Sequence, residues 1–131
     1  MSWTLTFDGS EVQSSEDLGG QLRLRLSAAS VHRSTGPLKT DVEAGYIKPV
    51  VLLFSGASWT GDLPGCLGAL SGGVLTVGVT SLQHMVLPST VAGPLQADFT
   101  FRSGDVLRIQ AASLDAACPD GEARFMPSYA C

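Results

Sequence analysis

The pair of residues best suited to nucleophilic chemistry in this chain is Cys66 with His84. Cys66 lies in a short loop-like stretch, LPGCLG, over residues 63–68. A thiol becomes a nucleophile when a nearby base takes its proton and an acidic residue orients that base. The surrounding sequence matches no nucleophile signature, and cysteine is among the residue types most often buried. We therefore keep a Cys66-dependent thiol enzyme only as an alternative.

Three other kinds of site find no support in the sequence. Neither His32 nor His84 has a second ligand at the i, i+2 or i, i+4 position, so no metal site is expected. The glycine-rich stretch over residues 65–73 lacks a following Gly-Lys-Ser/Thr, so it does not resemble a phosphate-binding loop. Paired carboxylates need contrasting environments, which spacing does not reveal. We expect that the protein has no catalytic residue, binds no cofactor and is not an enzyme.

Composition limits the partners of the protein. The 131 residues include 8 Lys and Arg and 12 Asp and Glu, for a net charge of −4, and charged residues make up only 15% of the chain. A nucleic-acid-binding domain normally gathers basic residues on one face, so we expect no nucleic-acid partner. Mild acidity suits a basic protein partner, although it also serves solubility alone. The length predicts a single domain over residues 1–131.

The cysteines and the hydropathy pattern bear on the compartment. Cys66, Cys118 and Cys131 are odd in number and form no C-x-x-C pair, which predicts neither a disulfide framework nor a zinc site. The first residues do not read as a secretory signal, and the longest continuous apolar run, PVVLLF at 49–54, is far shorter than a membrane helix. We expect a cytoplasmic protein with no membrane partner. A bridge between Cys118 and Cys131 is the alternative if a signal was removed.

The clearest structural signal is a β-hairpin over residues 93–112. Apolar side chains alternate with polar ones from Leu95 to Arg102, and alternation resumes from Leu107 to Ala111. Between them, residues 103–105 (SGD) supply the residue types of a tight turn. The pattern predicts two half-buried strands that pair with each other.

Similar alternation predicts strands elsewhere, with turn signals every ten to fifteen residues. The strands fall at residues 3–8, 22–28, 46–55 and 75–79, with a weak one at 123–131 interrupted by Pro127. Pro49 indicates an edge or a bulge. Residues 11–20 are expected to be a loop or a curled edge of the sheet, and residues 56–73 a loop. The tally of about seven strands predicts an all-β antiparallel sandwich or partly closed barrel; the alternative is an α+β fold with one short helix at 11–18 or 41–44.

Surface recognition is the function that remains after these exclusions. Trp59 stands in the glycine-rich connection with Asp62 close behind it, and an indole there either caps the core or meets a partner. Two acidic pairs lie in other predicted loops, and together they would form an acidic rim if the loops share one end of the fold. These pairs are Glu16 with Asp17, and Asp41 with Glu43.

We therefore expect a protein-binding module that contacts a basic protein through these six residues. The most specific form of this hypothesis is a small acidic inhibitor, or immunity-type protein, that neutralises a basic toxin or nuclease by direct binding. A second alternative is a barrel that holds a small lipid-like molecule, suggested by the aliphatic strands at 22–26, 50–54 and 75–79. We expect a monomer or a small homo-oligomer.

Overall fold

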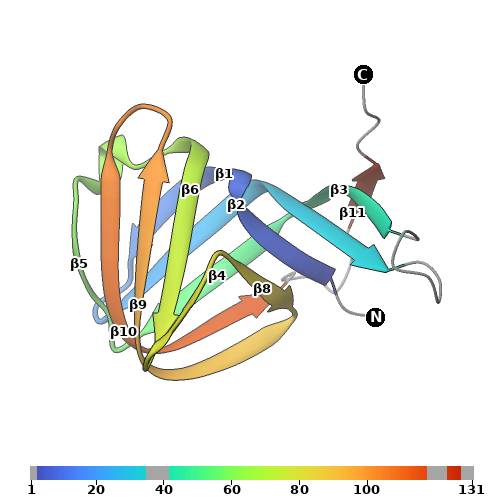
Figure 1. The fold of residues 1–131 in the computed structure, drawn as a ribbon. Coiled ribbons are helices and arrows are strands. Elements are labelled where there is room, and N and C mark those ends of the chain that lie inside the picture. The colour runs from blue at the N-terminus through green and yellow to red at the C-terminus, as the bar shows by residue number, and fades with distance from the viewer. Residues whose placement is uncertain (1–2, 35–41, 118–123, 128–131) are drawn as a thin grey trace.

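Extended strands account for about 80% of this computed structural model, which describes residues 3–34, 42–117 and 124–127 (Figure 1). No α-helix occurs within these ranges; one 3-10 turn, η1, spans Leu63–Gly65. The strands are β1 (Trp3–Asp17), β2 (Gln21–Ser34), β3 (Val42–Lys48), β4 (Val50–Ser55), β5 (Ser58–Thr60), β6 (Gly68–Val77), β7 (Thr80–Leu82), β8 (His84–Leu87), β9 (Ser89–Phe101), β10 (Val106–Ala117) and β11 (Arg124–Pro127).

Six of the strands close into an antiparallel barrel. Their order is β2, β4, β10, β9, β6 and β1, and the ring closes because β1 also pairs with β2. Closure removes the unpaired edges that an open sheet presents to other chains. Beyond the ring, β3 and β11 continue from β2, β8 pairs with β1, and β5 and β7 pair with β10 and β6. The prediction of an all-β sandwich or barrel is confirmed.

The strand count exceeds the expected seven because several predicted connections are themselves extended. Residues 11–17, expected to be a loop or one helical turn, belong to β1 and pair with β2. Their polar side chains cover the outer face of the barrel, so polarity here reflects an exposed strand face. From Val42 onward the second candidate helical turn is strand β3, while residue 41 lies outside the described ranges.

A bulge in β1 explains why the alternation in the sequence ends near residue 8. Gly9 has a φ of +87°, and the register of β1 on β2 shifts between Thr6 and Glu11. Ser10 is fully buried at the bulge, where its Oγ donates to the Thr6 carbonyl at 2.8 Å and accepts the Ser30 N–H at 2.9 Å. The strand bends without leaving buried polar groups unpaired.

The predicted hairpin is confirmed as β9 and β10. Leu107 pairs with Phe99, and Val106 pairs with Thr100. The turn closes through hydrogen bonds from the Phe101 N–H to the Asp105 carbonyl and from the Gly104 N–H to the Phe101 carbonyl, each 2.9 Å long. Gly104 has a φ of +99°, a conformation that suits glycine.

Pro49 divides the strand predicted over residues 46–55, as its missing N–H requires. The two parts, β3 and β4, pair with successive stretches of β2, so they lie end to end along it. The chain after β6 turns back at Gly78 to form β7 and then reaches β1 as β8. Residues 124–127 of the weak final strand form β11 against β3.

Aromatic and aliphatic side chains fill the interior of the barrel. The Phe99 ring contacts Phe7 and Phe54 edge to face, with centroids 5.4 Å and 6.4 Å apart. Inward residues of every barrel strand surround these rings, among them Leu24, Leu52 and Leu107. This packing accounts for the inward aliphatic residues of β2 and β4, which had helped to suggest a lipid-like ligand; that alternative stays a prediction. No helix among the described residues has the length and apolarity to cross a membrane.

Candidate functional site

The structure describes the side chains of four of the six predicted contact residues, Glu16 and Asp17 on β1, Trp59 on β5 and Asp62 just before η1. Glu16 and Asp17 end β1, where Glu16 forms an ion pair with Arg23 at 2.7 Å and Asp17 accepts the Gly19 N–H at 3.0 Å. These carboxylates are therefore engaged within the chain. Asp41 and the side chain of Glu43 lie outside the part of the chain that the structure describes. The expected acidic rim, made of Glu16 with Asp17 and Asp41 with Glu43, stays a prediction.

Trp59 lies on β5, a short strand that folds back onto β10. It pairs with Ile109, and directly opposed residues of an antiparallel pair point to the same face. Because Ile109 is fully buried, the indole points toward the interior, and it packs against the core while staying partly exposed. A hollow of about 200 Å³ borders its exposed side. Trp59 thus caps this part of the barrel.

Asp62 lies at one end of the barrel beside a carboxylate that the sequence does not link to it. A Cβ placed on Gly65 would be 3.4 Å from Asp62 Oδ2 and 3.3 Å from Asp105 Oδ2, so both carboxylates face the same glycine. η1 holds this arrangement, since the Gly65 and Cys66 N–H groups both donate to the Asp62 carbonyl, at 2.9 Å and 3.0 Å. Asp105 comes from the turn between β9 and β10.

Exposed apolar residues adjoin these two carboxylates. Leu67 is 42% exposed and Val106 is 48% exposed, and they follow Cys66 and Asp105 in the chain. We name Asp62, Leu67, Asp105 and Val106 the barrel-end patch. Neither of its carboxylates forms an ion pair with another residue in the described ranges. Uncompensated negative charge next to exposed apolar surface can attract and then hold a cationic partner.

Cys66 lies beneath the barrel-end patch and is a fully buried, free thiol. Burial raises the pKa of the Cys66 thiol, and the negative charges of Asp105 and Asp62 raise it further. All three effects disfavour the thiolate, which is the reactive form. His84, the suggested base, is exposed on β8 and is not among the groups that shift the Cys66 pKa. The surroundings of Cys66 therefore disfavour its reactive form, and the thiol-enzyme alternative stays a prediction.

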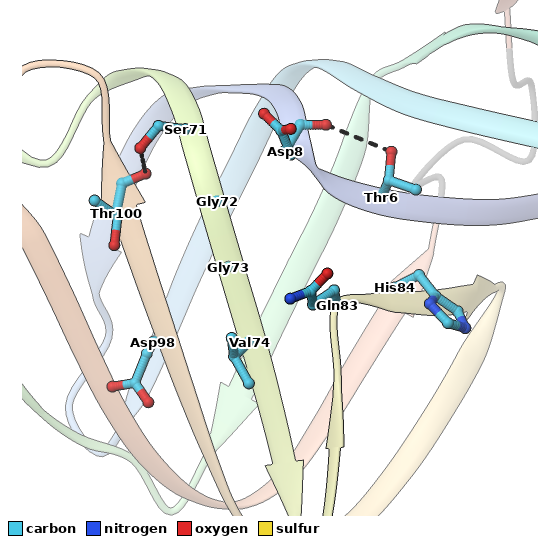
Figure 2. Close-up of a pocket in the computed structure, with 10 residues that line it drawn as sticks. All are labelled: Thr6, Asp8, Ser71, Gly72, Gly73, Val74, Gln83, His84, Asp98 and Thr100. Atoms are coloured by element: carbon cyan, nitrogen blue, oxygen red, sulfur yellow. Dashed lines mark hydrogen bonds between the residues drawn. The ribbon is translucent and has the colours of Figure 1, made fainter.

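A second feature is a groove of about 600 Å³ on the outer wall of the barrel, shown in Figure 2. Backbone of β6 runs through it, and a Cβ on Gly72 would meet nothing within 4 Å, so the groove is open above this residue. Mostly polar side chains from β1, β6, β8, β9 and the β7–β8 junction line it. These residues are Thr6, Asp8, Ser71, Val74, Gln83, His84, Asp98 and Thr100.

The groove exists because β1 leaves β6 to pair with β8. β1 pairs with β6 only through Glu11 and Val12, whereas residues 3–6 pair with β8. The lining could hydrogen-bond a polar ligand, but its charges are partly compensated, since Asp98 forms an ion pair with Arg108 at 2.7 Å. In the described ranges, no three His, Cys, Asp or Glu side chains come together in a way that could hold a metal ion.

Sequence reasoning missed Asp105, Leu67 and Val106 as members of the site that contains Asp62. The only signal at Asp105 was its place in the hairpin turn, which explains the residue without any partner. Its proximity to Asp62 depends on η1 folding onto that turn. Comparisons of the chain with protein-family models, with curated proteins and with solved structures found no match.

Proposed function

We propose that this protein binds a basic partner protein and that the barrel-end patch is the contact surface. The observation that carries the proposal is the pair of carboxylates of Asp62 and Asp105, which face one glycine without a compensating cation in the described ranges. Leu67 and Val106 supply exposed apolar area beside them. The groove is less suited to this role because its walls are mostly polar and one of its two carboxylates is already paired.

Within this class we propose the acidic inhibitor, or immunity-type protein, as the specific case. Paired negative charges would steer a cationic toxin or nuclease toward the patch and compete with its anionic substrate. The proposal assigns no chemistry to this chain, consistent with the buried, protonated state favoured for Cys66. It also includes a cytoplasmic location, which the free Cys66 thiol supports.

The test compares partners captured from a lysate of the source organism by three immobilised proteins. These are the wild type, the double variant Asp62→Asn with Asp105→Asn, and the control Asp8→Asn with Glu11→Gln. The control removes the same charge from exposed residues that belong neither to the barrel-end patch nor to the outer face of β4. We expect the wild type and the control to capture a basic protein. The amount captured by the double variant should be at least about tenfold lower, and salt should release the captured protein.

Two outcomes would contradict the proposal. Recovery of the same protein in equal amounts on all three supports would show that the barrel-end patch is not the contact surface. Recovery of no partner on the wild type at low ionic strength would count against protein binding itself. If a partner is recovered, an assay of its activity with and without this protein tests the inhibitor hypothesis directly.

A further inference from the structure

The outer face of β4 carries apolar side chains that the rest of the barrel leaves uncovered. Val50, Leu52 and Phe54 point inward and are buried, so Val51 and Leu53 point outward, where they are partly exposed. Leu18, 42% exposed, borders the same hollow of about 460 Å³. A strand that is apolar on both faces is typical of one covered on both sides. The sequence of β4 thus implies a cover that the described residues do not provide.

The register of the strands beside β4 arranges charges around this apolar centre. Leu53 pairs with Arg23 of β2 on one side and with Asp115 of β10 on the other. All three side chains share the outer face, because directly opposed residues of antiparallel strands point the same way. One row across three strands therefore carries a positive charge, an apolar side chain and a negative charge.

This row is complementary to itself. When a second copy is placed face to face by a two-fold axis parallel to β4, the β4 strands face each other and β2 of each copy lies over β10 of the other. Leu53 then meets Leu53, while Arg23 of each copy meets Asp115 of its partner. In the next row, Val51 pairs with Arg25 on one side and with Ala117 on the other. Val51 of one copy would then face Val51 of the second copy.

We propose that the outer face of β2, β4 and β10 is the interface of a two-fold symmetric dimer of this chain. Aligned packing of two sheets face to face is a common arrangement, with the sheets about 10 Å apart. Arg23 also bonds Glu16 at 2.7 Å within its own chain, and its 42% exposed side chain leaves it able to face the partner. The interface is separate from the barrel-end patch, so the dimer does not depend on the proposed function.

The test measures the molar mass of the full chain by sedimentation equilibrium over a wide range of protein concentrations. We expect a reversible dimer for the wild type. Leu53→Lys would place a cation at the centre of the interface and raise the dimer dissociation constant at least about tenfold. The control Val79→Lys adds the same charge at a fully exposed residue between β6 and β7, and it should leave dimerisation unchanged.

Charge reversal gives a readout that misfolding cannot imitate. Arg23→Asp and Asp115→Arg should each dimerise poorly alone, because each puts like charges opposite each other at both contacts. Mixed in equal amounts, the two variants should form a heterodimer. In that heterodimer the introduced aspartate of one chain faces the introduced arginine of the other, and the remaining native Arg23 faces the remaining native Asp115.

A wild type that stays monomeric at every concentration would overturn the proposal. So would a dimer that Leu53→Lys does not weaken, or a mixture of the two charge variants that forms no heterodimer.

Discussion

Gly73 lies directly against Phe7 in the wall of the barrel. A Cβ on Gly73 would be 2.7 Å from Phe7 Cβ and 2.9 Å from Phe99 Cδ1, which is closer than real Cβ atoms approach. Its neighbour Gly72 faces open space, with nothing within 4 Å. Two adjacent glycines therefore have different roles: Gly73 lets the aromatic core approach the strand, and Gly72 leaves the groove open.

This difference predicts opposite responses to the same substitution. Gly73→Ala should lower the free energy of unfolding by about 1–3 kcal/mol, because Phe7 and Phe99 must shift to admit the methyl group. Gly72→Ala should change it by less than about 1 kcal/mol in either direction. Urea denaturation followed by tryptophan fluorescence measures both. Equal losses in the two variants would show that the close approach to Phe7 is not what matters.

Replacement of Ser10 should destabilise the barrel through its hydrogen bonds. Ser10→Ala removes the acceptor of the Ser30 N–H and the donor to the Thr6 carbonyl in a fully buried position. Leaving such groups unpaired costs about 1–3 kcal/mol of unfolding free energy. Ser14→Ala on the same strand is the control, since the Ser14 hydroxyl has no hydrogen bond with the described residues. Thermal unfolding that ranks both variants alike would refute this role for the bulge.

The central ring of the core should be among the most sensitive positions. Phe99 contacts both Phe7 and Phe54 edge to face. Phe99→Ala should cost about 3–5 kcal/mol of unfolding free energy, through lost transfer energy and the cavity left behind. Val106→Ala, at a 48% exposed position on the adjoining strand, should cost far less. Chemical denaturation of the two variants tests the comparison, and a mild effect at Phe99 would mean that the core readily repacks.

Cys66 should make the stability of the fold fall at alkaline pH. Burial, together with Asp105 and Asp62, raises the pKa of the folded thiol above its ordinary value of 9.0. The folded state then holds its proton more tightly than the unfolded state, so the contribution is complete below pH 9.0 and is lost as pH rises through the folded pKa. Urea titrations across this range should show a shallower alkaline decline for Cys66→Val. An identical decline in both proteins would exclude this linkage.

The rate of alkylation separates a structural thiol from a catalytic one. In a chain with Cys118→Ser and Cys131→Ser, an alkylating reagent should modify Cys66 slowly in the native state and rapidly in urea, because the native thiol is buried and its pKa is raised. Mass spectrometry follows the reaction. Fast native alkylation at neutral pH would support the thiol-enzyme alternative.

The sequence alone determined the strands that have one buried and one solvated face. The β9–β10 hairpin and the inward residues Leu22, Leu24 and Leu26 of β2 follow from local alternation and turn chemistry, which nearby residues dictate, whereas Pro49 had indicated only an edge or a bulge. The strand formed by residues 11–17 was not predicted, because the bulge around Gly9 and Ser10 interrupts the alternation. The hydrogen bond between Ser10 and Ser30 that supports this bulge crosses to another strand.

Only the tertiary structure decided how these strands close and which surface residues meet. The pairing of β1 with both β2 and β6 closes the ring, and no local pattern encodes which distant strands become neighbours. In the same way, Asp62 meets Asp105 because η1 folds onto the hairpin turn, and Arg23, Leu53 and Asp115 form one row because three separate strands share a register. Alternation along a strand specifies which side chains face inward. Contacts across strands depend on which strands become neighbours, and in which register, when the whole chain folds.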